Sequence, residues 1–160
     1  MIALLNEIIY KKRIKRIKSS LKNCGSCLKI FGHPSFIHPE NIALGDNVNI
    51  NDGSILNATE SHIIIGNNVT VSSNAMILAA SYDVQKFLQG GEGSKKHKNS
   101  LIDIGDNVWI CAGAIILPDV TIADHVIIGA GSVVTRSVEK SWCVIAGNPA
   151  KVVKELSPEN

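Results

Sequence analysis

Five histidines are the side chains in this sequence best suited to move a proton near neutral pH. The ordinary pKa of imidazole is about 6.5, so histidine is the usual general base when a weak nucleophile such as a hydroxyl must lose a proton. His97 differs from the others because it lies in a long glycine- and lysine-rich stretch, GGEGSKKHKNS. Long loops in compact folds are usually functional or disordered. We therefore take His97 as the candidate general base, against the alternative of an exposed loop histidine.

The other four histidines are weaker candidates. His125 lies in an Asp-His pair typical of a turn, and His62 follows an irregular stretch. His33 and His38 each lie next to a proline. We expect structural or solvent-exposed roles for all four. A metal site for hydration chemistry would need several of these histidines as ligands, and since their spacing brings them together only by chance, we expect no metal.

The cysteines do not form a recognisable metal or redox motif. Cys24 and Cys27 make a CxxC pair, but no second close pair completes a zinc site, and no βαβ pattern suggests a thioredoxin-like role. No apolar run reaches the roughly 20 residues that cross a bilayer, and no signal peptide is recognisable. Reduced thiols and a cytoplasmic location are therefore expected.

Aliphatic residues recur at every sixth position, which is the strongest pattern in the sequence. A period of six fits neither an α-helix nor a simple strand. It fits a coil with three short flat faces, in which each aliphatic side chain points inward and stacks on its equivalent in the next coil. The longest unbroken series is Ile104, Ile110, Ile116, Ile122, Ile128 and Val134. An earlier series contains Leu44, Ile50 and Leu56 and then, after a slip in phase, Ile65, Val71 and Ile77.

Composition agrees with this interpretation. The 160 residues suit one domain, and 45% are hydrophobic while only 4% are aromatic, so the apolar content is mostly aliphatic. Polar pairs such as Asp106-Asn107 stand where the coil must turn. A net charge of +2 does not suggest a nucleic-acid partner. The fold class predicted is all-β, a left-handed parallel β-helix of hexapeptide repeats. We expect it to carry a short N-terminal amphipathic helix, a looped-out insertion and a C-terminal helix.

Two segments of the C-terminal half, IDIGDNVWICAGAIILPDVTIADHVIIGAGSVVTRSV and VIAGNPAKVVKEL, resemble the hexapeptide-repeat acyltransferases. The likeness is closest to the maltose, galactoside and polysaccharide O-acetyltransferases. The resemblance implies a homotrimer with active sites between adjacent subunits. It also implies acetyl-CoA as co-substrate and transfer of the acetyl group to a sugar hydroxyl.

The resemblance also assigns the acceptor side of the site. Related enzymes carry a catalytic histidine where this sequence has Tyr82, so His97, in the same interruption, is the nearest replacement. Tyr82 and Asp83 are then expected to orient the base or the acceptor, and the alternative is that Tyr82 marks lost catalysis. Asn51 falls where related enzymes have an acceptor-binding asparagine, with Asp52 as a weaker neighbour. A turn asparagine that serves its own backbone is the alternative for Asn51.

The donor side is better matched to the family. Ala112, Ala130 and Thr135 fall where relatives line the pantetheine groove. Lys151 falls where a basic residue meets the nucleotide phosphates, and Lys154, one helical turn later, matches a second basic position. For Lys154 the alternative is a solvated charge on a C-terminal helix.

The N-terminal segment is basic and patterned differently from the repeats. Residues 1–22 are predicted to form an amphipathic helix, either packed on the protein's own trimer or lying on an anionic membrane surface at the inner face. We divide the chain into a helix and cap at 1–41, a β-helix at 42–156 with a loop at 82–103, and a tail at 157–160.

The function predicted is acetyl-CoA-dependent O-acetylation of a saccharide in cell-surface polysaccharide biosynthesis, with direct attack by the hydroxyl. Two alternatives stay open. One is transfer to another small acceptor, such as an amino sugar, serine or an antibiotic. The other is a catalytically impaired β-helix scaffold.

Overall fold

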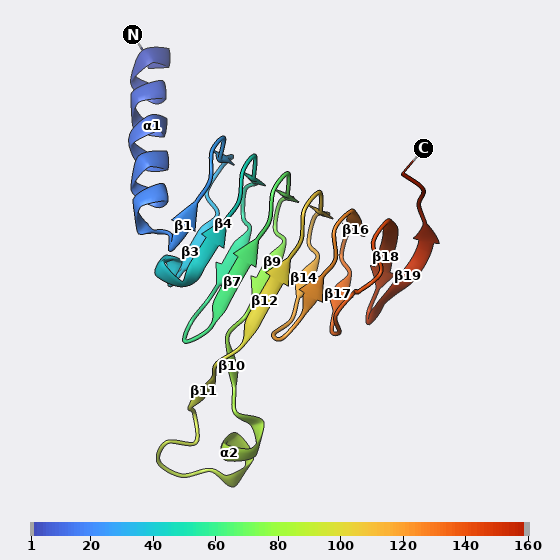
Figure 1. Cartoon of the computed structure of the whole chain (residues 1–160). Helices are drawn as coiled ribbons and strands as arrows, with labels where there is room; N and C mark the ends of the chain where they lie inside the picture. Colours follow the sequence, from blue (N-terminus) through green and yellow to red (C-terminus); the bar gives the residue numbers. More distant parts are fainter. Residues whose placement is uncertain (1, 159–160) are drawn as a thin grey trace.

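A computed structural model describes residues 2–158, with side chains from Glu7 onward. The chain winds into stacked coils whose short strands form three parallel sheets, the faces of a prism (Figure 1). The first face contains β1 (Asn23–Cys24), β4 (Ile42–Leu44), β7 (His62–Ile65), β12 (Leu101–Ile104) and β15 (Thr121–Ile122). The second face contains β2 (Lys29–Ile30), β5 (Asn49–Ile50), β8 (Thr70–Val71), β13 (Trp109–Ile110), β16 (Val126–Ile128), β18 (Cys143–Gly147) and β19 (Ala150–Glu155). The third face contains β3 (Ser35–Ile37), β6 (Ile55–Asn57), β9 (Met76–Leu78), β14 (Ile115–Ile116) and β17 (Val133–Val134).

The sixth-position aliphatic residues form the core of this prism. On the second face, Ile50 pairs in register with Val71, and Val71 with Ile110. All three side chains are fully buried. Their neighbours in sequence point outward, so each strand alternates between core and surface. The parallel β-helix predicted from the hexapeptide period is confirmed.

The corner between the first and second faces is held by side chains that bridge successive coils. Asp106 accepts the backbone N–H of Asn67 at 2.6 Å, and Asp124 accepts that of Asp106 at 2.7 Å. Glycine precedes Asn67 and Asp106 because the coils approach closely. A Cβ atom on Gly66 would overlap the Asp106 carboxylate and the backbone of Gly105. The polar pairs expected at the turns therefore link the coils to one another.

The repeat begins earlier than the predicted boundary at residue 42. Strands β1, β2 and β3 form a first coil, in which Cys24 pairs with Leu44, Ile30 with Ile50, and Phe36 with Leu56. These three pairs put Cys24, Ile30 and Phe36 six residues apart. The period was hidden there because a cysteine and an aromatic residue take two of the aliphatic positions.

The C-terminal helix predicted for the chain is wrong. Residues Ala150–Glu155 form β19, which runs antiparallel to β18. The last coil leaves the backbone groups of β18 without a further coil to bond, and pairing with β19 satisfies them. The peptide bond between Asn148 and Pro149, in the turn that joins the two strands, is cis.

Helix α1 (Ile2–Ser20) stands at the N-terminal end of the stack (Figure 1). Ile14 and Ile17 pack against the buried core, and Leu21 is buried beneath the helix. A short 3-10 helix, η1 (Pro39–Asn41), lies nearby and contacts α1. Neither helix nor any other in residues 2–158 combines the length and apolar character needed to span a membrane.

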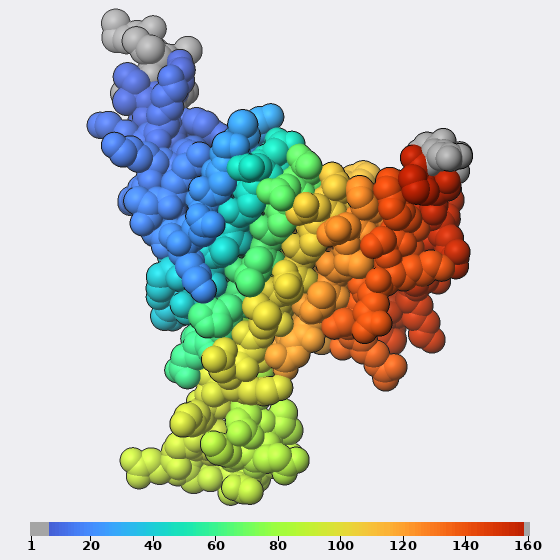
Figure 2. All heavy atoms as spheres, viewed as in Figure 1, coloured from blue at the N-terminus to red at the C-terminus, as the bar shows by residue number. Residues whose placement is uncertain are grey.

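One excursion leaves the coils between β9 and β12. It contains β10 (Ser81–Tyr82), α2 (Val84–Gln89) and β11 (His97–Lys98), and β10 pairs antiparallel with β11. Figure 2 shows it as a separate lobe projecting from the middle of the stack. It emerges at the corner between the third and first faces, in the break that the sequence places at 82–103.

Candidate functional site

The excursion brings together two residues singled out by the sequence. Tyr82 and His97 are directly opposite each other in the β10–β11 pair. Their rings meet edge to face with centroids 4.7 Å apart. Thus the histidine predicted as a replacement base lies beside Tyr82, the residue for which the resemblance implies a histidine. The Tyr82 side chain is 43% exposed, so a small molecule can reach this pair from solvent.

The His97 ring is half-buried, and its Nδ1 atom is buried without a hydrogen-bond partner among the described residues. A buried ring nitrogen normally has a partner, because leaving it unpaired costs free energy. The Nδ1 atom of His62 is buried without a described partner in the same way, so this feature shows incomplete hydrogen bonding in both imidazoles and does not by itself single out His97. This feature is compatible with a base that completes its contacts when a ligand or a neighbouring subunit is present.

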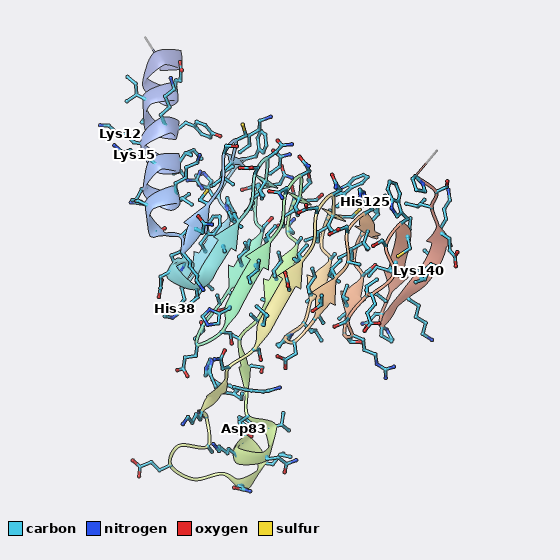
Figure 3. All side chains as sticks on the ribbon, in the orientation of Figure 1. Lys12, Lys15, His38, Asp83, His125 and Lys140 are labelled. Atoms are coloured by element: carbon cyan, nitrogen blue, oxygen red, sulfur yellow. The ribbon has the colours of Figure 1, made fainter. Side chains whose placement is uncertain are left out.

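Asp83 is expected from the sequence to orient the base or the acceptor, but its side chain contacts Lys86. Its carboxylate accepts the backbone N–H of Lys86 at 3.2 Å and lies 3.7 Å from the Lys86 ammonium. These contacts make Asp83 the N-terminal cap of α2, as Figure 3 illustrates by its place at the start of that helix. No described contact joins the Asp83 side chain to His97, so its role here is to shape the excursion.

A small apolar hollow of about 270 Å³ lies beside the pair. It is lined by Ser81, Tyr82, Val84 and Phe87. The rings of Tyr82 and Phe87 are stacked with centroids 5.7 Å apart. Apolar surface next to a candidate base is suited to the C–H face of a sugar ring, which packs on aromatic side chains.

The base of the excursion is tied to the coils by polar contacts. The Lys98 ammonium lies 2.7 Å from the Asp119 carboxylate, and Ser61 donates its hydroxyl to the Lys98 carbonyl at 3.2 Å. The Lys98 hydrogen bond and charge lower the pKa of Asp119, and the same contact raises the pKa of Lys98. The contact therefore holds Lys98, the residue next to His97, against the prism.

We expect Asp119→Asn to loosen the excursion without unfolding the coils. Amide hydrogen exchange in residues 81–98 should accelerate about two- to fivefold at pH 7, the size expected for one exposed ion pair. Because the pKa of Asp119 is lowered, its ionised carboxylate stabilises the contact at pH values above the ordinary carboxyl pKa of about 4. This stabilisation is lost as the pH falls through the lowered pKa. In Asp119→Asn, the protection of residues 81–98 against hydrogen exchange should therefore no longer fall as this carboxyl group titrates. Asp103→Asn, on the outward side of β12, should leave the exchange unchanged, and equal acceleration by both variants would contradict the assignment.

Asn51 and Asp52 lie at another corner, between the second and third faces. The Asn51 side-chain amide donates to the Val71 carbonyl at 3.1 Å. Asp52 accepts the His33 backbone N–H at 2.6 Å. Both side chains thus bridge adjacent coils. Within one chain they are not brought together with His97, because the excursion leaves from the next corner of the prism.

The predicted donor-binding residues fall into two groups. Thr135 and Lys151 line one cleft of about 550 Å³ at the C-terminal end of the stack. Ala112 and Ala130 are exposed on the corner between the second and third faces, where the Gly131 N–H donates to the Ala112 carbonyl at 2.9 Å. Lys154 is exposed on β19 but is not among the residues lining the cleft.

Two cations in the C-terminal cleft were missed from the sequence. Arg136 and Lys140 line it together with Lys151. Lys140 forms an ion pair with Glu155. Arg136 directly follows Thr135, so its position after a predicted groove residue was the available signal. Three cations around one cleft favour a ligand with phosphate groups.

The remaining candidates have structural contacts. His125 stacks on Trp142 with ring centroids 4.0 Å apart, and Trp109 donates its Nε1–H to the Ser72 hydroxyl at 3.0 Å. Cys24 is half-buried in the first coil, and burial raises the pKa of its thiol. In residues 2–158, no three histidine, cysteine, aspartate or glutamate side chains gather as a metal ion would need.

Known proteins resemble this chain over most of its length. The family described as bacterial transferase hexapeptide (six repeats) matches residues 101–136. The galactoside O-acetyltransferase of Escherichia coli K12 is 31% identical over 148 aligned residues, covering 92% of this chain and 70% of that protein. The crystal structure of a maltose O-acetyltransferase from Clostridium difficile 630 matches with a TM-score of 0.84 at 34% identity, covering 92% of this chain and 76% of that one. A galactoside acetyltransferase in complex with coenzyme A matches with a TM-score of 0.78 at 29% identity, covering 93% and 72%.

Proposed function

This chain belongs to the hexapeptide-repeat transferases of the galactoside and maltose O-acetyltransferase type, and from that premise we propose that it transfers an acetyl group from acetyl-CoA to a sugar hydroxyl. The observation that carries the proposal is the Tyr82–His97 pair on the excursion. It supplies an imidazole at the interruption where the family's base is expected. The hollow beside it supplies aromatic surface for a sugar ring.

In the proposed reaction the acceptor hydroxyl attacks the thioester carbonyl directly. His97 removes the hydroxyl proton as the C–O bond forms, which gives a tetrahedral intermediate with a negatively charged oxygen. The intermediate collapses by breaking the C–S bond, and the coenzyme A sulfur leaves and takes up the proton. The products are the sugar ester and coenzyme A, and no covalent bond to the protein is formed.

We place the donor nucleotide in the C-terminal cleft, where Lys151, Arg136 and Lys140 can bind phosphates. Lys151→Gln should weaken acetyl-CoA binding about tenfold, the usual size for one lost charge-assisted contact. Lys154→Gln removes an equal charge three residues away, outside that cleft, and should change the Kd less than twofold. Isothermal titration of coenzyme A into both variants checks this. Equal effects would indicate a general charge effect in place of a phosphate contact.

The proposed active site is shared between copies of the chain in a homotrimer. A single chain separates Asn51 from the His97 excursion by one face of the prism, so a neighbouring copy is needed to bring the two corners together. The outward side of the third face favours such packing, because its half-exposed outward side chains are uncharged and all but Asn57 are apolar. The apolar ones are Ile55, Met76, Leu78, Ile115 and Val133.

The direct test is coenzyme A release measured with a thiol reagent in the presence of acetyl-CoA and a panel of sugars. Release that depends on a sugar supports the proposal. Coenzyme A binding without any sugar-dependent release would favour the catalytically impaired scaffold. Including amino sugars in the panel tests the alternative acceptor, since an unprotonated amine needs less help from a base than a hydroxyl does. Acceptors from cell-surface polysaccharides are the sugars that we expect to react best.

A further inference from the structure

A second cleft, of about 610 Å³, lies at the opposite end of the molecule from the proposed nucleotide site. It opens between α1 and the turns that flank β3 in the first coil. Arg13, Arg16 and Ser20 line it from the helix, His33 lines it from the turn before β3, and Ser35 lines it from the start of β3. The Ser20 hydroxyl already donates to the Ile17 carbonyl at 2.8 Å. Two guanidinium groups, an imidazole and the Ser35 hydroxyl therefore remain as donors around one hollow, and this set fits the oxygens of a phosphate group.

The two arginines differ in how they are held. Arg13 donates to the Gly32 carbonyl, which fixes its guanidinium at the mouth of the turn. The Arg16 guanidinium has no hydrogen bond or ion pair to any described residue, and the residue is exposed. An arginine already placed beside a second one, with its own donors unused, is preorganised for an anion.

The surrounding charges leave the cleft positive. Seven cations lie within residues 11–22, and among described side chains only Lys11 has an ion-pair partner, Glu7. Two carboxylates that adjoin the lining residues are already engaged. Glu40 pairs with the His38 ring at 2.9 Å, and Asp52 accepts the His33 backbone N–H.

We propose that this cleft binds a phosphate or diphosphate group. The backbone N–H of His33, in the wall of the cleft, donates a hydrogen bond to the Asp52 carboxylate. Asp52 lies at the corner that carries Asn51, the predicted acceptor-binding residue. The ligand is then an acceptor whose sugar is joined to a phosphate, and only this last step rests on the proposed function. A nucleotide diphosphate sugar and the phosphate headgroup of a lipid present the same chemistry to the cleft.

The test uses inorganic pyrophosphate as the probe in isothermal titrations of the full chain. Arg16→Gln should weaken binding about tenfold, because one of two guanidinium contacts is lost. Arg13→Gln should weaken it similarly. Lys12→Gln removes the same charge from the side of α1 that faces away from the coils (Figure 3) and should change binding less than twofold. No measurable pyrophosphate binding, or equal losses in Arg16→Gln and Lys12→Gln, would overturn the proposal.

Two further arms identify the source of the phosphate. Uridine diphosphate binding that is lost in Arg16→Gln points to a soluble nucleotide sugar. Binding to phosphatidylcholine vesicles that contain phosphatidylglycerol, lost in Arg16→Gln but kept in Lys12→Gln, points to a lipid headgroup. Coenzyme A binding is measured in parallel and should be the same in all three variants, so a failure of the phosphate cleft is distinguished from a failure of the acetyltransferase proposal.

Discussion

His97→Ala should lower the kcat for sugar acetylation by about 10²- to 10⁴-fold, the range that a positioned general base contributes. The Kd for acetyl-CoA should not change, because His97 lies on the excursion and not in the C-terminal cleft. The loss is expected in kcat, since the imidazole acts on the proton that leaves during the chemical step. Steady-state kinetics with the best sugar from the panel, together with coenzyme A titrations, measure both quantities.

Two matched variants make this result interpretable. His38→Asn removes an exposed histidine outside the excursion, which pairs with Glu40, and asparagine tolerates the positive φ of 55° at that position. Its kcat should equal that of the wild type. Tyr82→His restores the family's residue at its usual place. Undiminished turnover in His97→Ala, or a large gain in Tyr82→His that survives the loss of His97, would show that His97 is not the base.

The position of the proposed base is encoded only partly in the sequence. The interruption at 82–103 identifies the segment that leaves the coils, because the sixth-position aliphatic residues stop at Ile77 and resume at Ile104. The pairing of Tyr82 with His97 depends on the register of β10 and β11. Fourteen residues rich in glycine and lysine separate the two, and such a connection does not specify a register. Sequence reasoning could therefore select His97 but could not predict its contact with Tyr82.

The roles of Asn51 and Asp52 show a second limit. Their hydrogen-bond partners, the Val71 carbonyl and the His33 N–H, belong to adjacent coils about twenty residues away in either direction. A turn asparagine that contacts an acceptor and one that bridges coils have the same residue type and the same position in the repeat. The distinction depends on side-chain direction, which periodicity does not report.

The coils themselves were predictable because one physical requirement repeats. Each inward side chain must be apolar and of similar size, and each outward one is unconstrained by the core. Strand β7 contains both kinds of isoleucine side by side. Ile65 is 2% exposed and pairs with Leu44 and Ile104, whereas Ile64 is 41% exposed and pairs with Ala43 and Asp103.

Ile65→Ala should therefore reduce the free energy of unfolding by about 2–5 kcal/mol, because it removes buried methyl groups and leaves a cavity in the stack. Ile64→Ala makes the same chemical change one residue away and should cost less than about 1 kcal/mol. Urea unfolding followed by circular dichroism at fixed protein concentration compares the two. Since the free energy of unfolding of a folded domain is only about 5–15 kcal/mol, Ile65→Ala should also lower the urea concentration at the unfolding midpoint markedly. Similar losses in both variants would mean that the sixth-position side chains do not carry the core, and the prism that positions the His97 excursion and both clefts would need another explanation.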